Sequence, residues 1–207
     1  ERKVCAWIQV RIGPNRVGPW GLLQSTADML KLLTKEDIIP HGVDKWMWVL
    51  SPILIFIPAA MVYALYPFDD GVIFADVNIG LFLLIAISAQ SVLPFLMGGY
   101  ASNSKYAMLG GMRTVAQMLS YEVPMVIALM GIVMITGSLK MSAIVEAQSN
   151  IWFIFLQPIA FLIFMVTCLV ESNRPPFNMV EGESEIIAGP FTEYTGMRWA
   201  LFFLAEF

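Results

Sequence analysis

Long charge-free apolar segments alternate with short polar ones along this chain of 207 residues. The clearest segment runs from Trp46 to Phe68 without a single charge, and at 1.5 Å per residue such a helix can cross a hydrocarbon core of about 30 Å. Three more spans are expected, at 79–104, 112–139 and 151–170, and a fifth, at 197–207, is incomplete. The pattern therefore predicts an all-α protein, a polytopic transmembrane helical bundle.

A different pattern precedes the first span. Between residues 20 and 37, apolar residues recur at steps of three and four, with charged residues between them. This periodicity predicts an interfacial amphipathic helix, lying on the membrane surface or against a partner. Residues 13–19, rich in Gly and Pro, are expected to form a rigid loop before it, whereas Gly110 and Gly111 are expected to mark a connection to a helix that begins near Met112.

Composition and charge agree with a membrane protein. Hydrophobic residues make up 58% of the chain and charged residues 14%, against roughly 25% charged in soluble domains. Eleven of the twelve Lys and Arg residues fall within 1–45, 105–122 and 171–198, which are every second loop between the expected spans and therefore lie on one side of the membrane. Because basic residues concentrate in cytoplasmic loops, loops 1–45, 105–122 and 171–196 are expected to face the cytoplasm, or the matrix in a mitochondrion.

The residues of this chain offer no redox centre. Cys5 and Cys168 lack the spacing of iron–sulfur or zinc ligands, and His41 is the sole histidine. The sequence also contains no dinucleotide fingerprint, phosphate loop or Ser/His/Asp set. We therefore expect no metal site, no catalytic group in this chain alone and no nucleic-acid partner. The chain starts without Met and ends in an apolar run, so we expect a single membrane domain, 1–207, from a longer protein.

The chemistry that remains is that of acids at or near membrane depth. Charge next to lipid is costly unless it is paired, hydrated or used to move protons. The candidates are Glu122, Glu171, Glu181, Glu183, Glu185, Glu193 and Glu206, several of them in the acidic inner loop 171–196. A solvated, acid-capped helix start is an alternative interpretation of Glu181, Glu183 and Glu185. Patterns alone leave a transporter and an electron-transport subunit both open.

Several blocks of residues follow one another as they do in a known family. They include Arg11-Ile-Gly-Pro-Asn-Arg-Val-Gly-Pro19, Ser120-Tyr-Glu-Val-Pro124, Glu171-Ser-Asn-Arg-Pro-Pro-Phe177 and Glu181-Gly-Glu-Ser-Glu185. Over its whole length the chain resembles the H-subunit family of NADH:quinone oxidoreductase (respiratory complex I), the membrane component that carries the quinone chamber. The resemblance implies a fragment of an eight-span bundle that lacks the first span and the last ones.

The resemblance also implies roles for individual residues. It assigns the acids named above to the cavity loop and a buried proton path. Positions near the quinone cavity match Arg2, Arg11, Asp28, Lys31, Glu36, Arg174, Phe177 and Asn178. The family usually has Asp where this chain has Asn178, which cannot exchange a proton at neutral pH. Arg2 and Arg11 could instead anchor the chain as basic residues at the inner surface, and Asp28 with Lys31 could be a simple surface pair.

As implied by the resemblance, quinone is the substrate, while FMN and iron–sulfur clusters reside in partner subunits. The expected partners are the peripheral-arm iron–sulfur and quinone-site subunits, the antiporter-like and small membrane subunits, and the lipid bilayer. The expected location is the bacterial plasma membrane or the mitochondrial inner membrane. The alternative is the equivalent subunit of an energy-converting hydrogenase, or of a ferredoxin- or deazaflavin-linked quinone or phenazine reductase. Glu181-Gly-Glu-Ser-Glu185 favours the quinone-linked branch, since hydrogenase relatives usually have Thr-His-Leu-Glu after the Pro-Phe block.

Overall fold

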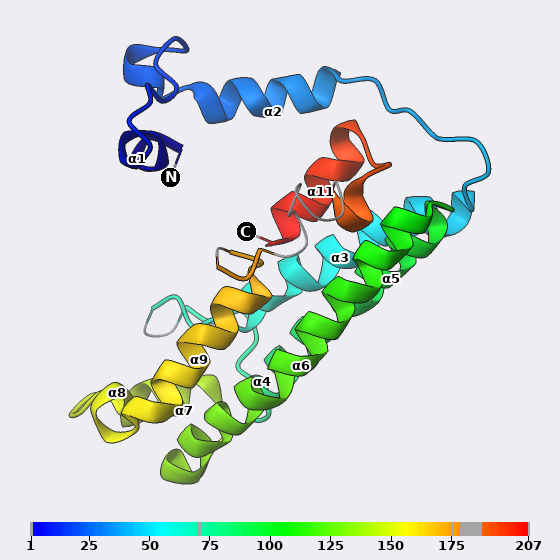
Figure 1. Ribbon diagram of the computed structural model, residues 1–207. Helices are drawn as coiled ribbons and strands as arrows, with labels where there is room; N and C mark the ends of the chain where they lie inside the picture. Colours follow the sequence, from blue (N-terminus) through cyan, green and yellow to red (C-terminus); the bar gives the residue numbers. More distant parts are fainter. Residues whose placement is uncertain (1, 70–71, 175, 179–187, 207) are drawn as a thin grey trace.

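The computed structural model describes residues 2–69, 72–174, 176–178 and 188–206, and these residues form helices and connecting segments with no strand longer than one bridge (Figure 1). The α-helices are α1 (Arg2–Ile8), α2 (Gln24–Thr34), α3 (Lys45–Leu65), α4 (Gly80–Ala89), α5 (Val92–Ala101), α6 (Lys105–Thr136), α7 (Met141–Ala147), α8 (Phe153–Leu156), α9 (Pro158–Glu171) and α11 (Gly196–Glu206). Short 3-10 turns lie at Pro19–Gly21 (η1) and Gly189–Phe191 (η2). The prediction of an all-α fold is confirmed.

Within the residues that the structure describes, three stretches are long and apolar enough to cross a membrane, judged by length and composition: α3, the consecutive helices α4 and α5, and α6. Helices α9 and α11 are apolar but shorter. Many large apolar side chains on the outer faces are exposed, among them Phe56, Ile127 and Leu162. Such faces suit contact with lipid, where exposed apolar surface has no cost.

Two of the expected spans are interrupted at proline residues. The span expected at 79–104 is divided between α4 and α5 at Gln90 and Ser91, just before Pro94. The span expected at 151–170 is divided at Gln157, and α9 begins with Pro158. Proline lacks an amide donor and its ring clashes with the carbonyl four residues earlier, which favours these two breaks, although α3 and α6 continue through Pro52, Pro58 and Pro124.

Helix α6 begins at Lys105, seven residues before the expected start near Met112. Gly110 and Gly111 lie inside this helix instead of marking a connection. A Cβ on Gly110 would come within 2.4 Å of the Gly189 Cα, and a Cβ on Gly111 would come within 3.1 Å of the Phe95 carbonyl oxygen. The two glycines therefore permit close packing of α6 against η2 and α5.

Two apolar clusters hold the bundle together at its opposite ends. One consists of Trp48, Ile55, Phe95, Ala101, Met118, Phe191, Tyr194 and Phe202. Within it, the rings of Trp48 and Tyr194 stack with centroids 3.7 Å apart. The other cluster consists of Leu81, Met125, Leu129, Ile144 and Phe153, near α7 and α8. The polar side chains considered below lie beside or between these clusters.

The amphipathic helix α2 is placed beside the start of α11 (Figure 1). Gly196 has a positive φ of 58°, and a Cβ there would lie 3.3 Å from the Lys35 carbonyl oxygen. The Ile38 amide donates to the Thr195 hydroxyl at 3.2 Å, and Arg198 pairs with Asp37 at 3.0 Å. These contacts fix the end of α2 against the bundle.

Candidate functional site

A cavity of about 310 Å³ lies between α2 and the start of α11. We call it the charged cavity, and it is lined by Arg2, Asp28, Lys31, Leu32, Lys35, Tyr194, Thr195, Gly196 and Trp199. Three of the predicted quinone-cavity residues, Arg2, Asp28 and Lys31, are thus brought together. The ammonium groups of Lys31 and Lys35 can each donate hydrogen bonds, and the aromatic rings offer flat apolar surfaces.

The acid in this cavity is paired. Arg2 Nη1 lies 2.5 Å from Asp28 Oδ2, and Gln24 Nε2 donates to Asp28 Oδ1 at 3.0 Å. The hydrogen bond from Arg2, followed by that from Gln24, holds the pKa of Asp28 below its ordinary value. Asp28 is therefore ionised at neutral pH, and it balances the charge of Arg2 while leaving the two lysines as the net positive groups of the cavity.

A phenol closes the charged cavity on its bundle side. Burial raises the pKa of the Tyr194 phenol above its ordinary value, so the group stays protonated and acts as a donor. Its hydroxyl donates to the Trp48 carbonyl at 3.4 Å. The Tyr194 ring therefore separates the charged cavity from the interior of the bundle.

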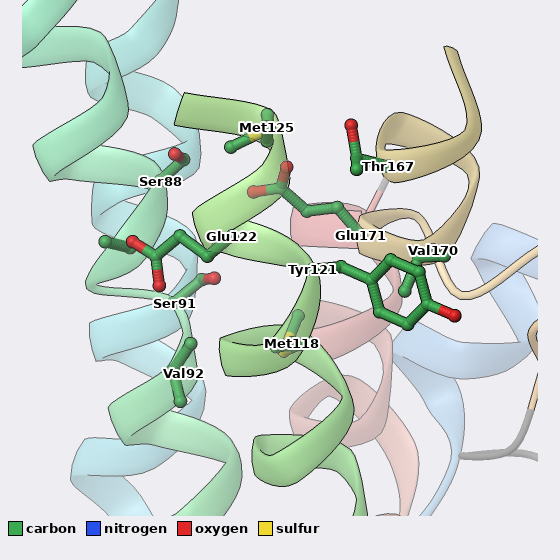
Figure 2. A pocket seen from close by; sticks show the side chains of 11 residues that line it. Ser88, Ser91, Val92, Met118, Tyr121, Glu122, Met125, Thr167, Val170 and Glu171 are labelled. Atoms are coloured by element: carbon green, nitrogen blue, oxygen red, sulfur yellow. The ribbon is translucent and has the colours of Figure 1, made fainter. Parts of the chain in front are cut away.

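A second, much smaller cavity lies inside the bundle between α6, α9 and the α4–α5 break (Figure 2). We call it the acid cavity. It is lined by Ser88, Ala89, Ser91, Val92, Met118, Tyr121, Glu122, Met125, Thr167, Val170 and Glu171. Figure 2 shows the Glu171 side chain extending from α9 toward Met125 on α6, while the Glu122 side chain points toward Ser88 and Ser91.

The acid cavity brings two carboxyl groups together with hydroxyl groups. Its two carboxyl groups, on Glu122 and Glu171, come from different helices and are both half-buried. Its volume of about 20 Å³ is sufficient for a single water molecule, which needs roughly 10–15 Å³ by this measure. Hydroxyl groups and water can bridge two carboxyl groups and pass a proton between them.

A third cavity, of about 440 Å³, adjoins the acid cavity. We call it the wide cavity; it shares Ser88, Ser91, Met118 and Glu171 with the acid cavity. Its other lining residues come from α3, α4, α5, α9, α11 and the turn after α9: Ile55, Pro58, Ala59, Val62, Tyr63, Tyr66, Ile87, Phe95, Cys168, Ser172, Asn173, Leu204 and Ala205. Glu171 therefore faces both internal cavities.

The remaining predicted site residues lie elsewhere in the part of the chain that the structure describes. Phe177 packs on α6, where its ring lies 5.8 Å from that of Tyr121 and its carbonyl accepts from Gln117 Nε2 at 2.9 Å. Arg11 is exposed and donates to Gln9, and Glu36 is exposed as well. None of these three, nor Arg174, Asn178 or the half-buried Glu193, lines the charged cavity.

Four predicted acids are not placed fully. Glu181, Glu183 and Glu185 lie outside the described residues, and Glu206 is described only as the last residue of α11. Within the described residues, no group of three or more His, Cys, Asp or Glu side chains could hold a metal ion.

Several cavity residues were not singled out from the sequence. Ser88 and Ser91 interrupt an apolar span, and Thr167 interrupts another, so polar groups within a span were an available signal. No local signal marks Tyr194 or Trp199. They line the charged cavity because α2 packs against the start of α11, which is a tertiary contact.

Comparison with known proteins shows the family of this chain. The family model described as NADH dehydrogenase matches residues 1–207. The chain belongs to this family. Relatives within it include proteins named as the H subunit of NADH-quinone oxidoreductase from Carboxydothermus hydrogenoformans and from a Geobacillus species, each 52% identical over all of this chain.

The chain spans about three fifths of the length of these family members, 59% of the first and 62% of the second. The resemblance recognised from the sequence blocks is thus confirmed at the level of the family and of the subunit to which it is similar.

Proposed function

We propose that this chain is part of the membrane subunit of a proton-pumping NADH-quinone oxidoreductase, in which it forms part of the quinone chamber and the start of the proton-coupling path. The observation that carries the proposal is the acid cavity, in which Glu122 and Glu171 share a space the size of one water molecule. The relatives are named as the H subunit of NADH-quinone oxidoreductase, which supports the quinone-linked function over the hydrogenase alternative.

In this proposal, the charged cavity receives the quinone head group. A quinone has two carbonyl oxygens that accept hydrogen bonds, and Lys31 and Lys35 are donors on the cavity wall. The rings of Tyr194 and Trp199 provide apolar surface for the head group. The ion pair of Arg2 and Asp28 fixes one wall of the cavity. Lys31 and Lys35 are then the cations that can stabilise negative charge on the quinone.

The proton path begins where reduction of the quinone changes the local charge. Each quinone reduced takes up two electrons and two protons, and the acids nearest to it are the groups that can supply or exchange protons. On this path Glu171 and Glu122 follow the quinone. In the proposal they are linked by water and by the hydroxyl groups of Ser88, Ser91 and Thr167. From there, protons move toward the antiporter-like subunits. Glu181, Glu183, Glu185, Glu193 and Glu206 extend the path in this proposal.

The electrons come from outside the chain. FMN and iron–sulfur clusters in the peripheral-arm subunits supply them, and this subunit binds and positions the quinone. Loops 1–45 and 171–196 and the start of α6 then face the cytoplasm of a bacterium, where the peripheral arm can cover the charged cavity.

The experiment replaces Glu122 or Glu171 by Gln in the assembled complex. Gln keeps the size and hydrogen bonding of Glu but cannot exchange a proton. NADH oxidation with a water-soluble artificial acceptor should stay normal, whereas quinone reduction and proton uptake into inverted membrane vesicles should fall about a hundredfold, the lower end of the usual contribution of a proton-transfer group.

Glu146→Gln is the matched control, because Glu146 is exposed on α7 at the opposite end of the bundle. Normal quinone reduction and proton uptake in both the Glu122 and Glu171 variants would contradict the proposal.

A further inference from the structure

Helix α2 forms one wall of the charged cavity and lies beside the bundle, not within it (Figure 1). Its connection to α3, residues 35–44, contains no helix or strand. Of the bundle helices, α11 is the one against which α2 mainly packs. The shape of the charged cavity therefore depends on how α2 and the start of α11 are held together.

The end of α2 lies directly against the start of α11. A Cβ on Gly196 would lie 3.3 Å from the Lys35 carbonyl oxygen and 3.7 Å from that of Glu36. The end of a helix carries partial negative charge and the start of a helix partial positive charge, so this approach is favourable. The Ile38 amide also donates to the Thr195 hydroxyl at 3.2 Å. Backbone groups thus provide the first point of attachment.

A pair of charged side chains provides the second. Arg198 Nη2 lies 3.0 Å from Asp37 Oδ2, and the side chains are 21% and 43% exposed, respectively. Arg198 Nη1 is buried and has no hydrogen-bond partner, so within the described residues Asp37 is the carboxylate that pairs with this guanidinium. Because a cation removed from water is costly without a partner, Arg198 favours the arrangement in which Asp37 stays close.

The pair joins the two walls of the charged cavity without lining it. Lys35, two residues before Asp37, lines the cavity from the α2 side, and Trp199, directly after Arg198, lines it from the α11 side. Neither Asp37 nor Arg198 is among the lining residues. The distance between the two walls is therefore coupled to a contact that a bound molecule does not touch.

We propose that Asp37 and Arg198 are a positioning pair, which holds α2 in the arrangement that binds the quinone head group. The inference rests on the proposed function, since it takes the charged cavity as the head-group site. Without the pair, α2 occupies the binding arrangement for only a fraction of the time, and the apparent affinity falls by that fraction. Saturating quinone restores the arrangement, so KM rises while kcat is little changed.

The test is Arg198→Gln in the assembled complex, with steady-state reduction of a short-chain quinone as the measurement. This variant leaves unpaired the more exposed member, Asp37, which water can hydrate. The KM should rise about fivefold, the factor that one partly exposed ion pair can supply, and kcat should be little changed. Normal NADH oxidation with a water-soluble artificial acceptor shows that the complex has assembled. Asp37→Asn should raise KM at least as much, because it strands the more buried cation.

Two further variants separate positioning from a general loss of structure. Arg198→Lys keeps the cation and should keep KM within about twofold of the parent value. Exchanging the charges, by Asp37→Arg with Arg198→Asp, should restore KM, and an acid at the start of α11 suits the helix dipole. An unchanged KM in Arg198→Gln, a loss confined to kcat, or a raised KM that neither variant restores would overturn the proposal.

Two controls complete the design. Asp76→Asn breaks the ion pair with Lys140 at the opposite end of the bundle and should leave KM unchanged, so an equal rise there would attribute the effect to general loosening and overturn the proposal. Lys31→Gln removes a donor that lines the cavity. A raised KM in Lys31→Gln with a parent value in Arg198→Gln would defeat the positioning role alone. Parent values in both would remove the charged cavity as the head-group site, and the proposed function with it.

Discussion

At the scale of single residues, the pair of Arg2 and Asp28 gives the charged cavity an ordered wall. Asp28→Asn removes the charge while keeping the shape, so the Arg2 guanidinium loses its partner. We expect the KM for a short-chain quinone to rise roughly two- to fivefold, as a partly exposed ion pair allows, with little change in kcat. Steady-state quinone reduction by the assembled complex measures both constants.

The pairing of Arg2 with Asp28 also predicts how the KM ratio depends on pH. The folded-state pKa of Asp28 is lowered. The stabilisation that ionised Asp28 gives the folded protein is therefore complete above the ordinary value of about 3.9, and it is lost only as pH falls through the lowered value. The KM ratio between variant and parent should therefore be constant from about pH 6 to 8. Exchanging the charges, by Arg2→Asp with Asp28→Arg, should restore the parent KM. A ratio that varies across this window would argue against the pairing.

At the scale of helices, Gly110 controls how closely α6 approaches η2. In Gly110→Ala, the new Cβ would lie 2.4 Å from the Gly189 Cα and 2.8 Å from the Gly189 carbonyl carbon, and backbone atoms cannot move aside as a flexible side chain can. We expect a loss of stability on the order of 3 kcal/mol, at the upper end for overpacking. The midpoint of thermal denaturation of the purified protein in detergent is the measurement.

Gly137→Ala is the matched control for this prediction. Gly137 caps the same helix with a φ of 63°, but a Cβ there would meet nothing within 4 Å. The expected cost is the backbone strain alone, about 1 kcal/mol. Equal losses in the two variants would show that close packing at Gly110 is unimportant.

A polar contact joins two connecting segments at the other end of the bundle. Lys140 Nζ lies 2.8 Å from Asp76 Oδ2, and Ser142 Oγ donates to the same carboxylate at 3.1 Å. The hydrogen bond from Lys140 is the main cause that lowers the pKa of Asp76. Its stabilising effect is therefore present above about pH 3.9 and is lost as pH falls through the lowered value.

Asp76→Asn should accordingly lower the thermal denaturation midpoint by the same amount at about pH 5 and pH 8, with the difference disappearing only in stronger acid. Glu146→Gln, also in this region but exposed, should leave the midpoint unchanged. A difference that grows or shrinks between these two pH values would contradict the assignment of the stabilisation to ionised Asp76.

At the scale of the whole molecule, the distribution of basic residues predicts which end of the bundle faces the cytoplasm. Cys5 is exposed near the charged cavity end, and Ser149 is exposed in the connection after α7 at the other end. A membrane-impermeant maleimide should label Cys5 only in inverted vesicles. In a Cys5→Ser, Ser149→Cys variant it should label intact cells. The reverse pattern would invert the proposed topology.

Much of the architecture could be predicted from the sequence because long apolar segments identify membrane spans. The span expected at 46–68 corresponds to α3, and the amphipathic helix expected at 20–37 contains α2. The sequence interpretation of Gly110 was wrong because a glycine can mark either a turn or a close helix contact, and only the position of η2 decides between them. Proline chemistry explains the breaks before Pro94 and Pro158 but could not have singled them out, because α3 continues through Pro52 and Pro58 and α6 continues through Pro124.

The candidate site was predictable to a smaller extent. The resemblance named Arg2, Asp28 and Lys31, which the structure gathers around one cavity, and Glu122 and Glu171, which line another. It gave no role to Tyr194, Asn173 or the serines, since their positions follow from packing between helices distant in sequence. Phe177 packs on α6, and the sequence offered no signal for that contact.

The shortness of α9 has an electrical consequence. With 14 residues it is about 21 Å long, against a hydrocarbon thickness of about 30 Å. In the proposed topology, with Pro158 at the outer boundary, Glu171 would lie about a third of the way in from the cytoplasm, and a proton bound there would have crossed roughly a third of the membrane voltage. At about 2.3 kcal/mol per charge for 100 mV, that fraction is worth about 0.8 kcal/mol, and an energised membrane would alter the occupancy of this acid about fourfold.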